Sequence, residues 1–195
     1  MEEGQLSKTD IRENVAEIIN QTPPEELALK YHKIQAQLFE FANFLESRIV
    51  LLFIDKPGEV KSRDIVAQAY HYNKIIVLPA FDPETCGMRL LKVDDPKRDL
   101  KKGPRGILEP DPGKCNEVPI ECIDIAVIPG IAFDEKGGRI GSGEGYYDRL
   151  IPKLAITTRK VALSLEAQLV PLVPMESHDR YVDIIISEDR VIYKI

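Results

Sequence analysis

Residues 127–150, with the sequence VIPGIAFDEKGGRIGSGEGYYDRL, are rich in glycine. This stretch contains six of the chain's 12 glycines: Gly130, Gly137, Gly138, Gly141, Gly143 and Gly145. Glycine permits positive φ and lets backbone N–H groups approach a ligand closely. A helix that follows such a loop adds unpaired donors and a partial positive charge at its N-terminus. The pattern therefore predicts an anion site, with phosphate oxygens as suitable partners.

Two common phosphate-binding patterns do not fit this loop. The dinucleotide pattern G-x-G-x-x-G needs a third glycine at position 146, where the chain has Tyr146. The P-loop pattern needs Gly-Lys followed by Ser or Thr, and the stretch lacks it. A glycine-rich turn without a ligand is the remaining alternative. The neighbouring residues favour a ligand: Arg139 suits phosphate oxygens, and the rings of Tyr146 and Tyr147 suit stacking. In addition, Asp148 could hold Mg²⁺.

The elements that must position this loop alternate between helix and strand. Helices are predicted over residues 7–20, from Thr22 toward Glu46, over residues 62–72 and from about Gly145. Buried strands are predicted at Arg48–Ile54, Lys74–Leu78, Ile123–Ile128 and Lys160–Leu165, with a terminal hairpin of Val182–Ser187 and Arg190–Tyr193. Continuous apolar strands separated by helices indicate a parallel sheet covered on both faces. We therefore predict an α/β fold over residues 1–195: a single-domain three-layer sandwich with a mostly parallel, doubly wound sheet.

Local signals refine this outline. Ser7 and Asp10 have the spacing of a capping box, as do Thr22 and Glu25, and Pro24 suits a first helical turn. Met88–Val93 is a further candidate strand, and residues 94–116 are predicted to form a long surface connection. The glycine-rich loop follows a buried strand, and ligands bind at the carboxyl ends of strands in such sheets.

Composition excludes several classes of protein. The chain has 195 residues, of which 44% are hydrophobic, and a formal net charge of −6. The excess of acid argues against a general nucleic-acid coat, and apolar runs such as Ile49–Ile54 are too short to span a bilayer. The polar N-terminus predicts no secretory signal. Cys86, Cys115 and Cys122 are expected to be free thiols. We expect a cytoplasmic monomer with small-molecule partners, no nucleic acid and no membrane.

The glycine-rich stretch also resembles a known family signature. PGIAFDEKGGRIGSGEGYYDRL is similar to the motif of the 5-formyltetrahydrofolate cyclo-ligase family, also called methenyltetrahydrofolate synthetases. Further pieces resemble the family in the same order along nearly the whole chain: Lys8–Arg12, Glu59 after a strand and turn, Gly106–Pro110, Leu165–Leu169 and His178–Asp183.

The resemblance implies ATP-dependent conversion of 5-formyltetrahydrofolate to 5,10-methenyltetrahydrofolate, with ATP and Mg²⁺ bound. The formyl oxygen is a poor leaving group, so the γ-phosphoryl group of ATP would be transferred to it before N10 attacks. The protein would then position two ligands and neutralise charge on the moving group. A non-catalytic paralogue that binds nucleotide or folate is an alternative, as is another ATP-using transferase on the same scaffold.

The resemblance also implies residue roles. Catalysis is expected of Lys8, Arg12, Arg139 and Tyr146. Nucleotide contacts are expected of Lys8, Arg12, Arg139, Gly141, Ser142, Gly143, Glu144, Gly145, Tyr146 and Tyr147. Folate contacts are expected of Glu59, Met88 and Tyr146, and Mg²⁺ contacts of Asp148 with Asp183 as a second ligand.

Each of these residues also has an ordinary structural explanation. Lys8 and Arg12 could form a solvated helix face, and Glu59 could be a turn acid. His178 could neighbour a phosphate or a metal ion, but a structural role is preferred. Glu144 departs from the family pattern, which leads us to expect a small or basic residue beside the phosphates. An unpaired carboxylate at this position would repel ATP. We expect it to face solvent or to pair with Mg²⁺ or a cation such as Arg149.

Overall fold

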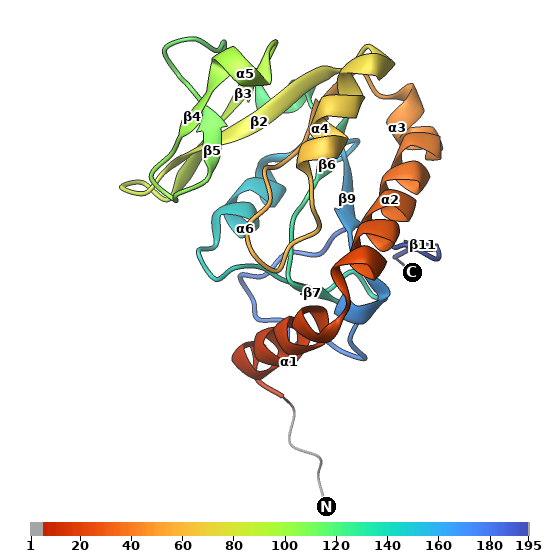
Figure 1. Cartoon of the computed structure of the whole chain (residues 1–195). Helices are drawn as coiled ribbons and strands as arrows, with labels where there is room; N and C mark the ends of the chain where they lie inside the picture. Colours follow the sequence, from red (N-terminus) through yellow and green to blue (C-terminus); the bar gives the residue numbers. More distant parts are fainter. Residues whose placement is uncertain (1–5, 195) are drawn as a thin grey trace, which may run out of the picture.

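The computed structural model describes residues 6–194, and its centre is a seven-stranded sheet (Figure 1). The strand order is β11-β10-β9-β6-β1-β2-β3. Neighbours from β10 to β2 are parallel, and β11 and β3 run antiparallel at the two edges. The chain winds outward from β1 in both directions, so the sheet is doubly wound. The predicted α/β class with a mostly parallel sheet is confirmed.

The elements have these bounds. The central strands are β1 Ile49–Leu51, β2 Ile75–Asp82, β3 Gly87–Lys92, β6 Ile125–Val127, β9 Arg159–Leu163, β10 Ile184–Ile186 and β11 Val191–Tyr193. The helices are α1 Lys8–Gln21, α2 Pro24–Glu40, α3 Ala42–Glu46, α4 Arg63–Ala69, α5 Pro96–Asp99 and α6 Tyr146–Leu150. Two small hairpins pair β4 Leu100–Lys102 with β5 Leu108–Pro110, and β7 Ala132–Phe133 with β8 Arg139–Ile140. Among the described residues, no helix has both the length and the apolar character to cross a bilayer. Residues 1–5 and 195 of the predicted domain lie outside the described residues.

Helices cover both faces of the sheet because successive strand residues point to opposite sides. On one face, α2, α3 and α4 pack against strand residues that include Val50 and Leu78. On the other face, α6 and the 3₁₀ turn Ile151–Lys153 pack against the intervening residues, which include Leu51 and Val77. These two cores make the three layers that the apolar runs predict.

The first helix, α1, packs on the β7/β8 hairpin rather than on the central sheet. It begins with the predicted capping box: Ser7 N–H donates to Asp10 Oδ2 at 2.9 Å, and Asp10 N–H donates to Ser7 Oγ at 3.2 Å. Its buried face, Ile11 and Val15, packs against the hairpin at Ile140. This hairpin lies within the glycine-rich stretch, so α1 is held beside the loop that the sequence marks as an anion site.

Three local predictions are wrong. Thr22 does not cap the second helix; its Oγ1 donates to the Ile18 carbonyl at 2.8 Å and so closes the end of α1. The single helix expected to run toward Glu46 breaks at Phe41, where extended backbone separates α2 from α3. Residues 94–116 contain α5 and the β4/β5 hairpin, because the Pro, Gly and charged residues of that segment surround two short strands.

The turn between β7 and β8 depends on one buried carboxylate and one glycine. Asp134 is 1% exposed, and its oxygens accept hydrogen bonds from the N–H groups of Gly138 at 2.8 Å and Val173 at 2.8 Å. Gly137 has φ of +84°, and a Cβ there would lie 2.3 Å from the Val182 carbonyl oxygen. Both positive φ and close backbone packing therefore require glycine at this position.

We predict that Gly137→Ala costs about 2–4 kcal/mol of unfolding free energy, because it adds a backbone clash to the strain of positive φ. Gly106→Ala is the matched control, since Gly106 has φ of +77° but nothing within 4 Å of the added Cβ. The control should lose only about 1 kcal/mol. Urea unfolding of both variants measures the difference, and equal losses would contradict the packing explanation.

Candidate active site

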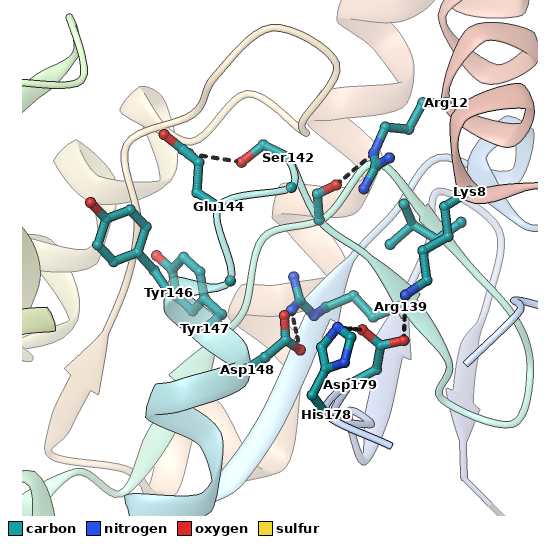
Figure 2. A pocket seen from close by; sticks show the side chains of 14 residues that line it. Lys8, Arg12, Arg139, Ser142, Glu144, Tyr146, Tyr147, Asp148, His178 and Asp179 are labelled. Carbon is teal, nitrogen blue, oxygen red and sulfur yellow. Dashed lines mark hydrogen bonds and ion pairs between the residues drawn. The ribbon is translucent and has the colours of Figure 1, made fainter. Parts of the chain in front are cut away.

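A cavity of about 300 Å³, here called the first cavity, opens where α1, the glycine loop and the start of α6 meet (Figure 2). It is lined by Lys8, Arg12, Arg139, Ile140, Gly141, Ser142, Gly143, Glu144, Gly145, Tyr146, Tyr147, Asp148, His178 and Asp179. The structure therefore brings together all the residues predicted to contact nucleotide. The glycine loop follows β6, so the cavity lies beyond the carboxyl end of a parallel strand, where β1 and β6 leave the sheet in different directions.

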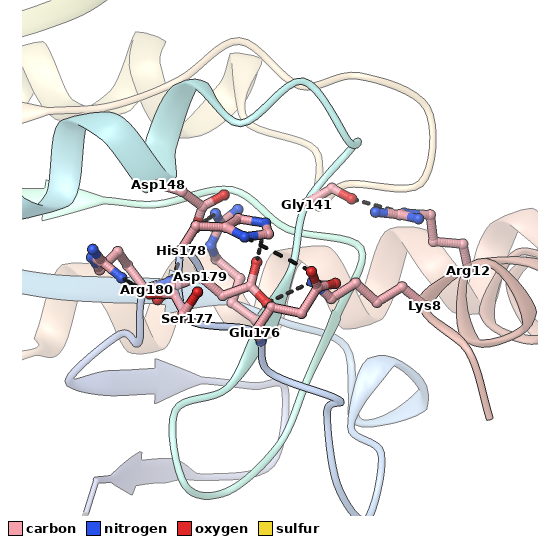
Figure 3. A network of polar contacts seen from close by, with 10 residues as sticks. Lys8, Arg12, Gly141, Asp148, Glu176, Ser177, His178, Asp179 and Arg180 are labelled. Atoms are coloured by element: carbon pink, nitrogen blue, oxygen red, sulfur yellow. Dashed lines mark hydrogen bonds and ion pairs between the residues drawn. The ribbon is translucent and has the colours of Figure 1, made fainter. Parts of the chain in front are cut away.

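Two cations of α1 face this cavity. Lys8 Nζ lies 2.9 Å from Glu176 Oε1 and 2.5 Å from Asp179 Oδ2 (Figure 3). Burial by itself would lower the pKa of Lys8, but these two carboxylates outweigh it and raise the pKa. One helical turn later, Arg12 Nε donates to the Gly141 carbonyl at 2.9 Å. The helix thus delivers two positive charges to the edge of the glycine loop.

A buried ion pair lies beneath the loop. Arg139 is 4% exposed; its Nη2 donates to Asp148 Oδ1 at 2.8 Å and its Nη1 donates to the Pro129 carbonyl at 3.1 Å. Asp148 Oδ1 also accepts from the Arg180 N–H at 3.1 Å. Arg139 Nε is buried and has no hydrogen-bond partner among residues 6–194. A Cβ on Gly141 would lie 2.7 Å from Arg139 Nη1, so this glycine makes room for the guanidinium.

The glycine loop turns through two residues with positive φ, Gly143 at +99° and Gly145 at +72°. The helix that follows, α6, has only five residues. Because so short a helix has a small macrodipole, we expect its N-terminus to contribute little to anion binding. The positive charge at the first cavity comes instead from side chains of α1 and β8.

The Glu144 side chain is 39% exposed and pairs with cations, as expected, but its partners do not include the Arg149 side chain, which donates instead to the Glu144 backbone carbonyl. Its carboxylate accepts from Lys56 Nζ at 2.7 Å and from the guanidinium of Arg105. Burial alone would raise its pKa, but the hydrogen bonds from these two cations prevail and lower the pKa to about 2. The carboxylate that departs from the family pattern is thus neutralised by cations from two other loops.

A second, much smaller cavity of about 10 Å³ adjoins the first. It is lined by Ile54, Lys56, Glu59, Pro79, Phe81, Arg105, Ile107, Leu108, Pro129 and Tyr147. Tyr147 lines both cavities. Tyr146 packs edge-to-face on Phe81, with 4.8 Å between ring centroids. The two neighbouring tyrosines of the signature therefore stand at the boundary between the cavities.

Glu59 is a buried carboxyl group in this second cavity. It is 6% exposed, and Oε2 accepts from the Lys56 N–H at 2.9 Å. Burial raises its pKa to about 7, although the Lys56 N–H bond and the charges of Lys56 and Arg105 oppose the rise. A carboxyl group in such surroundings can accept or donate a hydrogen bond near neutral pH.

Two predicted site residues lie away from the cavities. Asp183 stands at the amino end of β10, where Oδ2 accepts from Lys160 N–H at 3.0 Å, so its pairing with Asp148 around one ion is corrected. Met88 lies on β3 as the register partner of Phe81, half-buried against the second core, and lines neither cavity.

The site residues expected from the sequence do not include Asp179, and His178 is preferred there as a structural residue. Both line the first cavity, and His178 is 67% exposed with Nε2 3.5 Å from Asp179 Oδ1, which is not the environment of a structural core histidine. Asp179 and Asp183 occur in the same short motif, and the sequence offers no way to tell which of the two carboxylates lines the first cavity. Besides Glu144, the first cavity thus presents two further carboxylates, Asp148 and Asp179.

The raised pKa of Glu59 predicts a pH dependence of stability. The folded protein binds the proton of Glu59 more tightly than the unfolded chain does, so its contribution is full below pH 4.5 and is lost as the pH rises to about 7. The loss is at most about 3 kcal/mol. Glu59→Gln has no carboxyl group at this position and should not show this loss of stability. The unfolding free energy of the variant minus that of the unsubstituted protein should therefore rise with pH. Urea unfolding across this range, with the exposed Glu121→Gln as control, measures the effect; a constant difference would contradict it.

The chain is similar to known proteins over most of its length. The model of the 5-formyltetrahydrofolate cyclo-ligase family matches residues 5–188. The 5-formyltetrahydrofolate cyclo-ligase of Haemophilus influenzae is 30% identical over 157 residues, which cover 78% of this chain and 84% of the relative. The NMR structure of the Aquifex aeolicus 5,10-methenyltetrahydrofolate synthetase superposes with a TM-score of 0.82 at 30% identity, covering 96% of this chain and 92% of that one. The chain belongs to the 5-formyltetrahydrofolate cyclo-ligase family.

Proposed function

We propose that this protein converts 5-formyltetrahydrofolate and ATP to 5,10-methenyltetrahydrofolate, ADP and phosphate. One observation carries the proposal: cations of α1 and β8 line the first cavity together with the glycine loop, and this cavity adjoins the buried carboxyl group of Glu59. Adjacent sites suit a reaction in which a phosphoryl group passes from one ligand to the other. Family membership supports the same reaction.

The reaction needs activation of the formyl oxygen, which cannot leave unaided when N10 attacks the formyl carbon. Transfer of the γ-phosphoryl group to that oxygen breaks the bond to ADP and forms an imino-phosphate. N10 then adds to the activated carbon, the carbon–oxygen bond breaks and phosphate leaves with the oxygen. The proton of N10 is released to solvent. Catalysis then consists of positioning and of neutralising charge on the phosphoryl oxygens.

The cations of the first cavity are the groups we propose for the triphosphate. Lys8 and Arg12 project from one face of α1, and Lys8 already holds two carboxylates whose place phosphate oxygens could take. Backbone N–H groups of the glycine loop would add neutral donors. We propose that Arg139 contributes its positive charge from beneath the glycine loop, where it is buried, and that it holds Asp148 in position.

Mg²⁺ fits the donor set of the first cavity. The carboxylates of Asp148 and Asp179 both line it, and Mg²⁺ is commonly held by one or two carboxylates together with substrate phosphates. We propose these two residues as its ligands. The ion would neutralise charge on the phosphate oxygens.

Glu59 is the residue we propose for recognition of the pterin ring, whose amino and ring N–H groups are donors. Because its pKa is about 7, the carboxyl group can lose its proton near neutral pH at little free-energy cost and then accept hydrogen bonds from these donors. We propose that Tyr146 contacts folate at the boundary of the cavities, with Tyr147 shared between both ligands. We also propose a cytoplasmic monomer, since one chain lines both cavities and the three cysteines are free thiols.

The direct test is a reaction of the protein with Mg·ATP and 5-formyltetrahydrofolate, followed by the absorbance of methenyltetrahydrofolate. We predict product with ATP, none without it, and one ADP released per product. An unchanged spectrum in both reactions, with nucleotide or folate still bound, would favour the non-catalytic paralogue.

Lys8→Ala should raise the KM for ATP about tenfold or more and lower kcat/KM by up to about 100-fold, because one charge-assisted phosphate contact is lost. Lys33→Ala is the control, since Lys33 is an exposed lysine on α2 that lines neither cavity. Steady-state kinetics with varied ATP measures both. Normal ATP kinetics in Lys8→Ala would contradict the proposed role of α1.

A further inference from the structure

Arg105 fills the space next to Glu59. Its side chain is 8% exposed, and the guanidinium carbon lies 3.9 Å from the ring centroid of Phe81 and 5.1 Å from that of Tyr146. Only about 10 Å³ remains in the second cavity, which is room for about one water molecule. A flat heterocycle therefore cannot lie beside Glu59 while Arg105 keeps this position.

An ion pair holds Arg105 there. Arg105 Nε lies 3.3 Å from Glu144 Oε1, and its Nη2 contacts Oε2 of the same carboxylate. Glu144 belongs to the glycine loop and lines the first cavity, whereas Arg105 lines the second. This contact thus connects the two cavities directly. Lys56 Nζ, 2.7 Å from Glu144 Oε2, joins the pair from a third loop.

The segment that carries Arg105 is a narrow hairpin tip. The turn between β4 and β5 is closed by two backbone bonds, from Gly103 N–H to the Ile107 carbonyl at 2.8 Å and from Gly106 N–H to the Gly103 carbonyl at 3.1 Å. Gly106 has φ of +77° and open space around it. Among the described residues, Glu144 is the one hydrogen-bond partner of the Arg105 side chain, which otherwise lies against the rings of Phe81 and Tyr146.

We propose that Arg105 is a gate over the folate cavity and that Glu144 is the latch that keeps it closed. The inference rests on the proposed function, because it takes the second cavity as the folate site. A triphosphate in the first cavity would repel the Glu144 carboxylate and attract Lys56 and Arg105, so nucleotide would release the gate. Each ligand then favours binding of the other, since coupling between sites is reciprocal.

The test is calorimetric binding of 5-formyltetrahydrofolate to the unsubstituted protein, to Arg105→Ala and to Lys102→Ala, each with and without the β,γ-imido analogue of ATP. Lys102 is an exposed lysine of the same hairpin, so its variant controls for the lost charge. Without nucleotide, Arg105→Ala should bind about tenfold more tightly than the other two, because no closed state competes. The analogue should tighten binding to the unsubstituted protein and to Lys102→Ala, and leave Arg105→Ala unchanged.

Weaker or equal binding by Arg105→Ala would overturn the gate, since the arginine would then hold the substrate or be neutral to it. If none of the three proteins binds 5-formyltetrahydrofolate in either condition, the proposed function is wrong. The ion pair between Arg105 and Glu144 is therefore also tested by a measurement that needs no ligand. Urea unfolding of Arg105→Ala, Glu144→Gln and the double variant forms a double-mutant cycle. A double variant that loses less than the sum of the single variants supports the latch; additive losses overturn it.

Discussion

The ion pair between the buried Arg139 and the partly exposed Asp148 is the interaction on which the site depends. It joins β8 to the start of α6 beneath the glycine loop, and through the Arg180 N–H it also fixes the segment that carries His178 and Asp179. Breaking such a pair leaves an uncompensated charge in the interior, which costs several kcal/mol, about 3–5 in typical cases. The conformation of the loop is therefore set before any ligand arrives.

Around this fixed pair, the other charges of the site are arranged so that they can change partners. Lys8 is held by Glu176 and Asp179, and Glu144 is held by Lys56 and Arg105. Each set is partly exposed, so its contacts are individually weak and are replaced at small cost. A polyanion offers the cations new partners and leaves the carboxylates to a metal ion or to solvent. Under the proposed function, such an exchange of partners would let a chain with a net charge of −6 hold a triphosphate.

The fold was readable from the sequence because its signals are local. Continuous apolar runs predicted the parallel strands, and glycine spacing located the loop that follows β6. The ion pairs were not readable, since Glu144 meets partners 88 and 39 residues away in the chain. Likewise, only the path of the chain between β9 and β10 in the structure shows that Asp179, and not Asp183, lines the first cavity. Short strands within residues 94–116 were concealed by the charged residues that surround them, and with them the position of Arg105.

The central claim is that cations of α1 and the glycine loop enclose a nucleotide's phosphates. Its most direct test is a crystal structure of the protein with Mg²⁺ and the β,γ-imido analogue of ATP. We predict phosphate oxygens within hydrogen-bond distance of Lys8 Nζ and the Arg12 guanidinium, with the Lys8 contact to Glu176 broken. Phosphates bound elsewhere, for example beside Lys136 and Arg190 in the groove on residues 169–175, with Lys8 still paired to Glu176, would contradict the account.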